Sequence, residues 1–448
     1  MTRPTAARTA ALEAMRGMRA GLLADHAFAD AARALDTRDR AWAQELVFGT
    51  LRLRGRLDWM LAHASSRPLA KLDADVLDIL RLGAYQLVAM DGVPAYAAVS
   101  EAVDMTRGVA RSAAGFVNAV LQALRRAPDA STFPALDADP VGHLSTWGSH
   151  PRWLVERWVE RFGVADAERL VAANNRRPQL YLRVLGPDVA DVADRLRVAG
   201  ITTGPVLFAP RALRAVDGSA ADAVAAAPVI VQDPAATLVV DYAFAGGRAG
   251  GVVLDLAAAP GGKALALAAI GAAEFVVAAD RSVRRLRQVV DNVTRLEREP
   301  PAGLGEIDIA TVVADARHAP FRQARTVLLD APCTGTGTLR RHADGRWRLR
   351  PEDVTSLVGV QRELLAAAAA LVAPGGMLVY STCSLEAEEN EQQVSHFLER
   401  HVDFAVEQGT GVDDAMISDA GALHVLPHRD GVDGAYAARL RRSGADAG

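Results

Sequence analysis

The segment GVVLDLAAAPGGKA, residues 251–264, decides the fold of the second half of the chain. An apolar run ends at Asp255, a Pro-Gly-Gly turn follows, and a helical pattern begins near Lys263, which predicts a strand, a tight turn and a helix. The glycines let the backbone pass close to a ligand, and the first amides of a helix attract anions. Positions 257 and 264 are Ala, whereas a Walker A loop needs Gly and then Ser or Thr there, which disfavours a nucleoside triphosphate. Taken alone, the segment fits an ordinary strand-to-helix turn better than a ligand site.

Apolar segments of strand length recur after this one, with helical patterns between them. The alternation is typical of an open, mostly parallel sheet, and two late segments around an Asp/Gly-rich turn predict an antiparallel hairpin that closes the edge of the sheet. We therefore predict a Rossmann-like α/β domain with a seven-stranded sheet over residues 236–442. Its strand segments are 252–256, 275–280, 311–315, 326–330, 376–381, 422–427 and 434–440.

The rest of the chain divides into four parts. Residues 1–127 carry helical apolar spacing throughout and predict an all-α domain, and the Pro-, Asp- and Ser-rich residues 128–150 predict a linker. Residues 151–235 predict a small α/β domain, and residues 443–448 a tail. The small domain should hold two short helices at 152–162 and onward to about 174, strands at 179–185, 205–210 and 228–233, and a helix at 188–200 closed by Gly200.

Charge is spread unevenly along the chain. The net charge of −4 argues against a uniformly basic nucleic-acid binder, but residues 1–126 hold 17 Lys+Arg against 13 Asp+Glu. This balance suggests a basic N-terminal module, with an ordinary solvated surface as an equal alternative. Lys71 and Lys263 are the two lysines among 50 basic residues, which suggests that position 263 cannot take a guanidinium.

Several classes of protein are excluded by composition. The longest apolar stretch, 364–373, stops at Pro374 and is too short for a membrane span, and the N-terminal residues lack the apolar region of a secretory signal. We expect a cytoplasmic monomer. Two cysteines rule out a disulfide framework or a Cys-rich zinc site, and the ten histidines show no metal-ligand spacing, so no metal is expected.

Three predicted strands of the large sheet end in or near an aspartate. Asp280 follows Asp255 by 25 residues, close to the spacing at which a carboxylate accepts hydrogen bonds from a ribose diol. Asp315 ends the next strand, where its side chain could reach an adenine amino group. Each aspartate singly fits a helix cap better, but three at successive strand ends behind one glycine turn favour an adenosine-containing cofactor.

The two cysteines follow two other strands of the same sheet. Cys333 lies in DAPCTGTG, which begins at Asp330, and Cys383 lies in YSTCS, which begins at Tyr380. A buried inert thiol is the usual role of a lone Cys, but two thiols in loops at one sheet edge favour a reactive pair. Two thiols, an adenosine cofactor and no metal suit methylation of cytosine at carbon 5, because a thiolate added at carbon 6 makes carbon 5 nucleophilic and S-adenosylmethionine supplies the methyl group.

These motifs, with RRHADGRW downstream, Glu389-Asn390-Glu391 and the Asp433-Gly434 hairpin, resemble in order and spacing the RNA 5-methylcytosine methyltransferases over about residues 150–442. The resemblance implies that Cys383 is the nucleophile and that Cys333 assists product release, while Asp330 holds the cytosine edge and borders the cofactor. The cofactor's ribose and adenine would lie on Asp280 and Asp315. Its methionine end would be lined by Ala257, Ala258, Ala259, Pro260, Gly261, Gly262 and Lys263.

The N-terminal segment resembles the helical domain of the antitermination factor NusB, on RDRAWAQELVFGTLRLRGRLDWML, ILRLGAYQLVAMDGVPAYAAVSEAV and GFVNAVLQALRR. A NusB-like domain, a small RRM-like α/β domain and this catalytic domain form the architecture of bacterial 16S rRNA (cytosine-5) methyltransferases of the type that modifies cytosine 967 in rRNA numbering. The resemblance implies RNA, foremost 16S rRNA, as partner, and docking of that RNA by the helical and middle domains.

The chain departs from this family at four positions. The family more often has Cys or Thr at Ala257 and Thr or Ser at Ala264, and Gln122 and Leu185 stand where Arg and Asn are expected on surfaces that would meet RNA. A tRNA cytosine-5 methyltransferase and a non-catalytic RNA-binding or ribosome assembly factor remain the alternatives. A small-molecule methyltransferase would not need the helical domain, and DNA cytosine methyltransferases resemble a scheme with a single Pro-Cys thiol.

Overall fold

A computed structural model describes residues 4–127, 132–186, 188–244, 251–269, 271, 273–298 and 308–444. The chain forms two compact units. The first comprises Met1–Arg176 together with Leu339–Leu349, and the second comprises Arg177–Thr338 with Arg350–Gly448. The helical unit therefore includes a short segment, Leu339–Leu349, that lies in the sequence between two strands of the second unit. Residues 128–131 of the predicted linker and 445–448 of the predicted tail lie outside the described residues.

The first unit is helical, as its apolar spacing predicts. One core joins its first six α-helices, with Leu46, Leu57, Ile79 and Leu121 fully buried. Gly49 of α3 lets Tyr85 of α4 approach closely, because a Cβ at position 49 would lie 2.0 Å from the Tyr85 hydroxyl oxygen. The helices are α1 (Ala6–Arg19), α2 (Ala24–Ala31), α3 (Thr37–Ala64), α4 (Ala74–Val88), α5 (Ala95–Val109), α6 (Ala114–Arg126), α7 (Pro140–Thr146), α8 (Arg152–Asn175) and α14 (Gly345–Arg348), with 3-10 turns η1 (Leu69–Lys71) and η2 (Arg111–Ala113).

Two features of this unit refine the sequence-based expectation. Part of the predicted linker folds as α7, whose N-terminus is capped by the Asp139 carboxylate, which accepts a hydrogen bond from the Gly142 amide at 2.8 Å. Within α8 the backbone leaves the helical region at Gly163, where φ is 78°, so the two short helices predicted on either side of Phe162 are present.

The segment Leu339–Leu349 is held in the helical unit by a buried arginine. Arg346 is fully buried and its guanidinium donates to the carbonyls of Asn174 and Leu339, both at 3.0 Å, and to the Asn175 side chain at 2.8 Å. The Trp347 indole donates to the Leu51 carbonyl at 2.7 Å. A planar guanidinium has five N–H donors, so one arginine can satisfy several buried oxygen atoms at once.

The second unit begins with a small antiparallel sheet in the order β2-β3-β1-β4. The strands are β1 (Leu180–Val184), β2 (Thr203–Pro205), β3 (Ala212–Ala215) and β4 (Val229–Val231), with helices α9 (Val189–Val198) and α10 (Ala220–Ala226). The prediction of a strand at 205–210 was wrong, since β2 ends at Pro205 and Leu207 is 89 % exposed. Strand β3 was missed, because its four residues show no clear alternation.

The large sheet confirms the Rossmann-like prediction, with seven strands along the order β10-β12-β9-β8-β5-β6-β7 and an eighth, β11, paired with β12. Strands β5 to β9 are parallel, and β12 runs antiparallel to β9, β10 and β11. They are β5 (Val252–Asp255), β6 (Phe275–Asp280), β7 (Ile309–Val313), β8 (Ala324–Asp330), β9 (Val372–Thr382), β10 (Phe404–Val406), β11 (Leu423–Val425) and β12 (Ala435–Arg442).

The predicted late hairpin needs correction. Strands β11 and β12 pair as expected, but β12 lies between β9 and the short β10, so the pair does not close the edge. The connection between them also contains a helical turn, α17 (Pro427–Asp430), which ends at Gly431 with φ 73°. The edge strand β10 is three residues long and escaped the sequence pattern.

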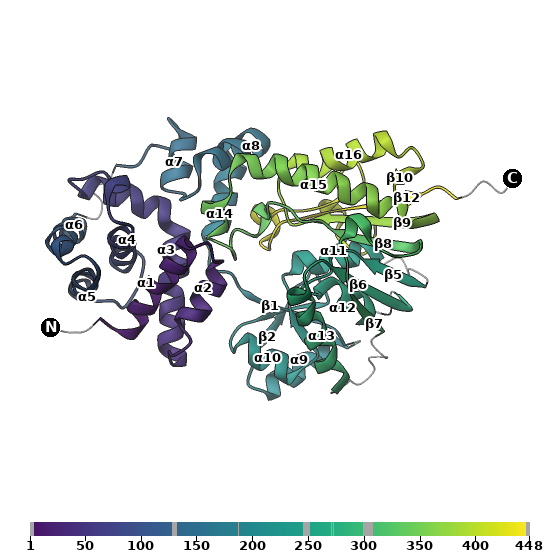
Figure 1. Ribbon diagram of the computed structural model, residues 1–448, viewed down its shortest axis with the longest axis horizontal. Coiled ribbons are helices and arrows are strands. Elements are labelled where there is room, and N and C mark those ends of the chain that lie inside the picture. Colours follow the sequence, from purple (N-terminus) through teal and green to yellow (C-terminus); the bar gives the residue numbers. More distant parts are fainter. Residues whose placement is uncertain are drawn as a thin grey trace. The chain divides into compact units, whose positions relative to one another are not determined.

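Helices cover both faces of the large sheet (Figure 1). Because strand side chains alternate, Val327 and Leu329 pack under one set of helices while Leu328 packs under the other. The first face is covered by α15 (Pro351–Ala370) and α16 (Glu391–Arg400), and the second by α11 (Pro234–Phe244), α12 (Gly262–Ala269) and α13 (Val283–Arg298). Short 3-10 turns lie at η4 (Ala316–His318), η5 (Thr336–Thr338), η6 (Ala387–Glu389) and η7 (Asp414–Met416).

Candidate active site

The parallel register brings the candidate residues to one edge of the sheet. Asp255 ends β5, Asp280 ends β6 and Asp330 ends β8, and these strands are direct or near neighbours in the sheet. Asp330 pairs in register with Ser381 of β9, and Cys383 follows that strand by one residue. The carboxyl-terminal edge is where doubly wound sheets bind their ligands.

Lys263 joins the glycine turn to the Asp330 loop. Its ammonium donates to Asp330 Oδ2 at 2.6 Å, and the Ser381 hydroxyl donates to Asp330 Oδ1 at 2.7 Å. Burial works to lower the pKa of Lys263, but the charge and hydrogen bond of Asp330 outweigh burial, and the pKa is raised. Asp255 and Cys383 add to that rise, so the ammonium lies within electrostatic reach of the Cys383 sulfur.

Asp255 is buried without a hydrogen-bond partner. The residue is 1 % exposed, and neither carboxylate oxygen has a hydrogen-bond partner in the described part of the chain, although the nearby Ala257 amide acts to lower the pKa. Burial, reinforced by the charge of Asp330 and opposed by Lys263, raises the pKa of Asp255 to about 7. A buried polar group of this kind suits a ligand that brings hydrogen-bond donors or positive charge.

The two cysteines face each other across the edge. Their Sγ atoms lie 3.4 Å apart, and both residues are half-buried. The hydrogen bond to Cys383 and then burial raise the pKa of the Cys333 thiol well above its usual value. The two loops are also joined through their backbones, because the Ala331 amide donates to the Ser381 carbonyl and the Gly337 amide donates to the Cys383 carbonyl at 3.0 Å.

A buried carboxylate ties the two cysteine loops together. Glu389 is fully buried and accepts from the Thr334 amide at 2.9 Å, from the Thr334 and Ser384 hydroxyls, and from the Gln361 amide at 3.1 Å. Burial raises the pKa of Glu389 despite these donors. Thr334 follows Cys333 and Ser384 follows Cys383, so this one carboxylate contacts the neighbour of each thiol.

Asp280 and Asp315 have partners of different kinds. Asp280 is 4 % exposed, accepts from the Ser282 amide at 2.8 Å, and has the Arg285 guanidinium at 3.7 Å. Asp315 lies two residues beyond β7, beside Asp280 through the Ala314 amide, which donates to the Asp280 carbonyl at 3.2 Å. The Arg317 side chain and amide hydrogen-bond to Asp315 and lower its pKa well below the usual range.

The turn at 257–263 is tightly packed. Gly261 has φ 101°, and a Cβ there would lie 2.9 Å from Val289 of α13, so both backbone shape and space require glycine. The Ala259–Pro260 peptide is cis, and the Arg285 guanidinium donates to the Ala259 carbonyl. Ala258, Ala259 and Ala264 are buried core residues, and Ala257 is half-buried.

The prediction that Leu185 lies on a surface that meets RNA was wrong. Leu185 is fully buried and packs with Ile230 and Leu265. An asparagine there would place an amide in an apolar cluster, so the leucine belongs to the core. Gln122 is half-buried on α6.

Sequence reasoning missed the partners of the named residues. Asp255 was noted for its spacing but not as an unpaired acid, the Lys263–Asp330 ion pair was not predicted, and Glu389 had no role beyond its motif. The scarcity of lysine did single out position 263. Over the described residues, no group of three or more His, Cys, Asp or Glu side chains could hold a metal ion, and no helix is long and apolar enough to cross a membrane.

The sheet and its edge define a Rossmann-like methyltransferase carrying a helical domain, and comparison with known proteins gives the family. Residues 247–441 match the model of the 16S rRNA methyltransferase RsmB/F family, residues 5–126 match the NusB family, and residues 150–220 match the ferredoxin-like domain of RsmF/B-like methyltransferases. The chain belongs to the RsmB/F family of 16S rRNA methyltransferases.

Relatives and a solved structure match nearly the whole chain. Rv1407 of Mycobacterium tuberculosis is 36 % identical over 92 % of this chain and 90 % of its own. Ribosomal RNA small subunit methyltransferase B of Erwinia tasmaniensis is 33 % identical over 92 % of each chain. The crystal structure of PH0851 superposes with a TM-score of 0.79 at 26 % identity and covers 99 % of this chain and all of its own. These matches confirm the predicted family and its helical N-terminal domain.

Proposed function

We propose that this chain methylates carbon 5 of a cytosine in 16S rRNA with S-adenosylmethionine as methyl donor, acting as a monomer through a covalent Cys383 adduct. The observation that carries the proposal is the 3.4 Å separation of the two thiols beside the Lys263–Asp330 ion pair. A reaction in which one thiol attacks the ring and a second assists the later release of the first needs both groups within reach of one ring.

Residues at the sheet edge fit the methyl donor. The unpaired, buried Asp255 carboxylate and the glycine turn at 261–262 offer negative charge and close backbone approach, which suit the positively charged methionine end of the donor. Residues 257–263 would line that end and Asp330 would border it. Asp280 would accept from the ribose diol and Asp315 would face the adenine. The bound cofactor supplies an electrophilic methyl group.

The protein's part in the chemistry follows from bond and charge balance. The Cys383 thiolate forms a bond to carbon 6, and the electron pair of the 5,6 double bond moves into the ring. Carbon 5 would then take the methyl group as its bond to the donor's sulfonium breaks and the rest of the donor leaves as a neutral thioether. Asp330 and Lys263, at the pyrimidine edge, hold the ring and balance the charge that develops on it. A base such as a water molecule then takes the carbon-5 proton, the C–H electron pair restores the 5,6 double bond, and Cys383 leaves as thiolate, to which the Cys333 thiol can donate a hydrogen bond.

The electrostatics support this division of labour between the thiols. The raised pKa of Cys333 keeps that residue a thiol, able to donate a hydrogen bond to the Cys383 sulfur. A nucleophile needs the thiolate, whereas a residue that stabilises the departing thiolate by donating a hydrogen bond needs its proton. Cys383 therefore fits the attacking role and Cys333 the releasing role.

Mapping of 5-methylcytosine tests the proposal. We expect one cytosine of 16S rRNA to lose its 5-methyl mark in a strain without this protein, and purified protein to restore the mark on 16S rRNA from that strain. A missing mark in tRNA alone would move the substrate to tRNA. Unchanged marks in both RNAs would favour a binding or assembly protein and overturn the proposal.

A further inference from the structure

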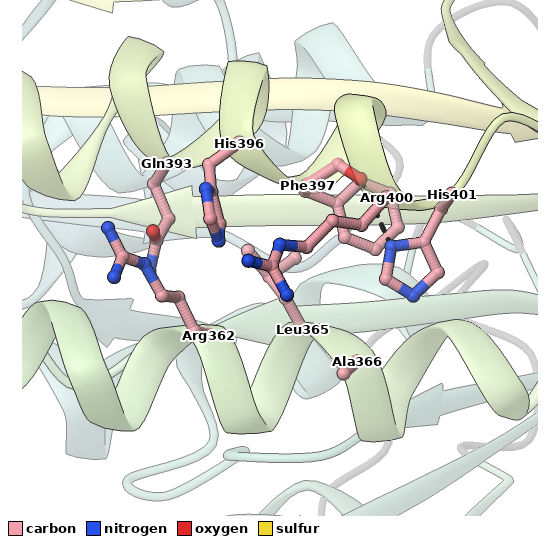
Figure 2. Close-up of a pocket in the computed structure, with 8 residues that line it drawn as sticks. All are labelled: Arg362, Leu365, Ala366, Gln393, His396, Phe397, Arg400 and His401. Carbon is pink, nitrogen blue, oxygen red and sulfur yellow. Dashed lines mark hydrogen bonds between the residues drawn. The ribbon is translucent and has the colours of Figure 1, made fainter.

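A groove about 360 Å³ in volume lies between α15 and α16, on the sheet face opposite α12 and α13. Two arginines and two histidines are among the eight residues that line it, although the chain as a whole carries a net charge of −4. Arg362 projects from α15, and His396 and Arg400 project from α16 into the space between the helices (Figure 2). The groove is outside the active-site residues described above.

Three basic side chains of the groove lack a protein partner in the described structure. Among the described residues, no hydrogen bond or ion pair involves the guanidinium groups of Arg362 and Arg400 or the imidazole of His396. Many other arginines of the chain pair with an acid, as Arg317 does with Asp315 and Glu363. Glu363, next to Arg362, is thus already engaged, and Glu399, next to Arg400, does not line the groove.

The floor of the groove is formed by buried apolar side chains and by a histidine ring held in place. Leu365 and Phe397 are buried in the core beneath it, and the His401 ring stacks on Phe397 with centroids 4.2 Å apart. His401 Nδ1 donates to the Phe397 carbonyl at 3.0 Å, which fixes the ring and leaves Nε2 without a partner in the described structure. An apolar floor strengthens attraction between a groove cation and an anion, because water is displaced from one side.

We infer that this groove binds phosphate groups of the RNA substrate, away from the cytosine that is methylated. Two guanidinium groups and an imidazole around one cleft can donate hydrogen bonds to phosphate groups of a nucleic-acid backbone, and no acidic residue lines the groove that would favour a basic peptide. The identity of the RNA in this inference rests on the proposed function. The phosphate contact rests on the residues of the groove.

Salt dependence of RNA binding tests the inference on the full-length protein. Binding of a 16S rRNA transcript is measured between 50 and 200 mM salt for the wild type and for Arg362→Ala/Arg400→Ala. Each lost phosphate contact makes the slope of log K against log salt shallower by about 0.7 to 0.9. With two contacts removed, raising the salt from 50 to 200 mM should weaken binding by a factor that is roughly tenfold smaller in the variant than in the wild type. At the lowest salt the variant should bind more weakly.

Two further variants separate a phosphate site from general charge and from misfolding. Arg287→Ala/Arg298→Ala removes two exposed arginines of α13, on the other face of the sheet, and should keep nearly the wild-type slope. Arg362→Lys/Arg400→Lys keeps the two charges and should also keep the slope. Thermal unfolding of all three variants should match the wild type, since none of the four arginines has a hydrogen bond or ion pair within the described part of the chain.

The inference is overturned if Arg362→Ala/Arg400→Ala keeps the wild-type slope, or changes it no more than the α13 control. It is also overturned if free RNA binding is unchanged while activity on an assembled ribosomal particle falls, because the groove would then meet a ribosomal protein. Loss of 5-methylcytosine formation by the wild type would refute the proposed function, but the slope comparison would still decide whether the groove binds RNA phosphate.

Discussion

Thr334 donates twice to the buried Glu389 carboxylate, through its backbone amide at 2.9 Å and through its hydroxyl. Because Ser384 donates to the same carboxylate, Glu389 fixes the two loops that carry the thiols. The 3.4 Å gap between Cys333 and Cys383 therefore depends on a residue that touches neither sulfur in the described contacts.

We predict that Glu389→Ala lowers kcat strongly while the KM for RNA changes little. The substitution leaves the Thr334 amide buried without its acceptor and leaves the Gln361 amide with only the Pro332 carbonyl. Loss of the Thr334 amide's acceptor costs about 1 to 3 kcal/mol, and both loops are released. Glu389→Gln should retain much of the activity, because its oxygen still accepts and the hydroxyls of Thr334 and Ser384 can turn to accept from its amide. Steady-state kinetics and denaturant unfolding measure both effects. Equal activity in Glu389→Ala and the wild type would show that the loops hold their positions without this carboxylate.

The sequence predicted strand ends and loop positions better than contacts. Asp255, Asp280 and Asp330 fall at the predicted ends of strands because a strand-turn-helix repeat has strong local signals. The Thr334–Glu389 hydrogen bonds join residues 55 positions apart, and no local pattern encodes such a pair. The same reason explains why Leu185 was placed on a surface: its burial comes from Ile230 and Leu265, which are distant along the chain.

Short strands were not predicted from the sequence for a different reason. Strands β3 and β10 have four and three residues, too few to reveal an alternation, and their pairing partners define them. The apolar residues at 205–210 gave a false strand, because Leu207 is an exposed loop side chain. Hydrophobicity without periodicity does not separate a strand from a loop that lies on the surface.

Asp255 provides a prediction about pH. Its pKa rises from 3.8 to about 7 in the folded protein, so folding binds a proton at this group, and the stability that it contributes is complete below the unfolded pKa and lost as pH rises through 7. We predict that Asp255→Asn stabilises the cofactor-free protein at pH 8 relative to the wild type, by at most about 4 kcal/mol, with little difference near pH 4. Urea unfolding at both pH values measures this, and a wild-type advantage at pH 8 would contradict it.

Asp280 provides a prediction about cofactor binding. A ribose diol that donates to this carboxylate forms a charge-assisted hydrogen bond, so Asp280→Ala should weaken S-adenosylmethionine binding by roughly tenfold or more. Asp280→Asn keeps an acceptor for the Ser282 amide and removes the charge, which isolates the diol contact from the local cap. Calorimetry on both variants is the measurement. Unchanged affinity in both would place the ribose elsewhere.

The two thiols provide the sharpest prediction, because their variants should behave in opposite ways. Cys383→Ala removes the atom that bonds to carbon 6, so it should neither methylate RNA nor form an adduct. Cys333→Ala should still attack and methylate, and then accumulate as a protein–RNA adduct that survives denaturing electrophoresis, since release of Cys383 comes after methyl transfer. The raised pKa of Cys333 fits this late role, because a thiol that stays protonated at neutral pH is a poor nucleophile. An adduct with Cys383→Ala and none with Cys333→Ala would reverse the two roles. Full methylation with normal release by both variants would mean that the 3.4 Å thiol pair takes no part in the chemistry.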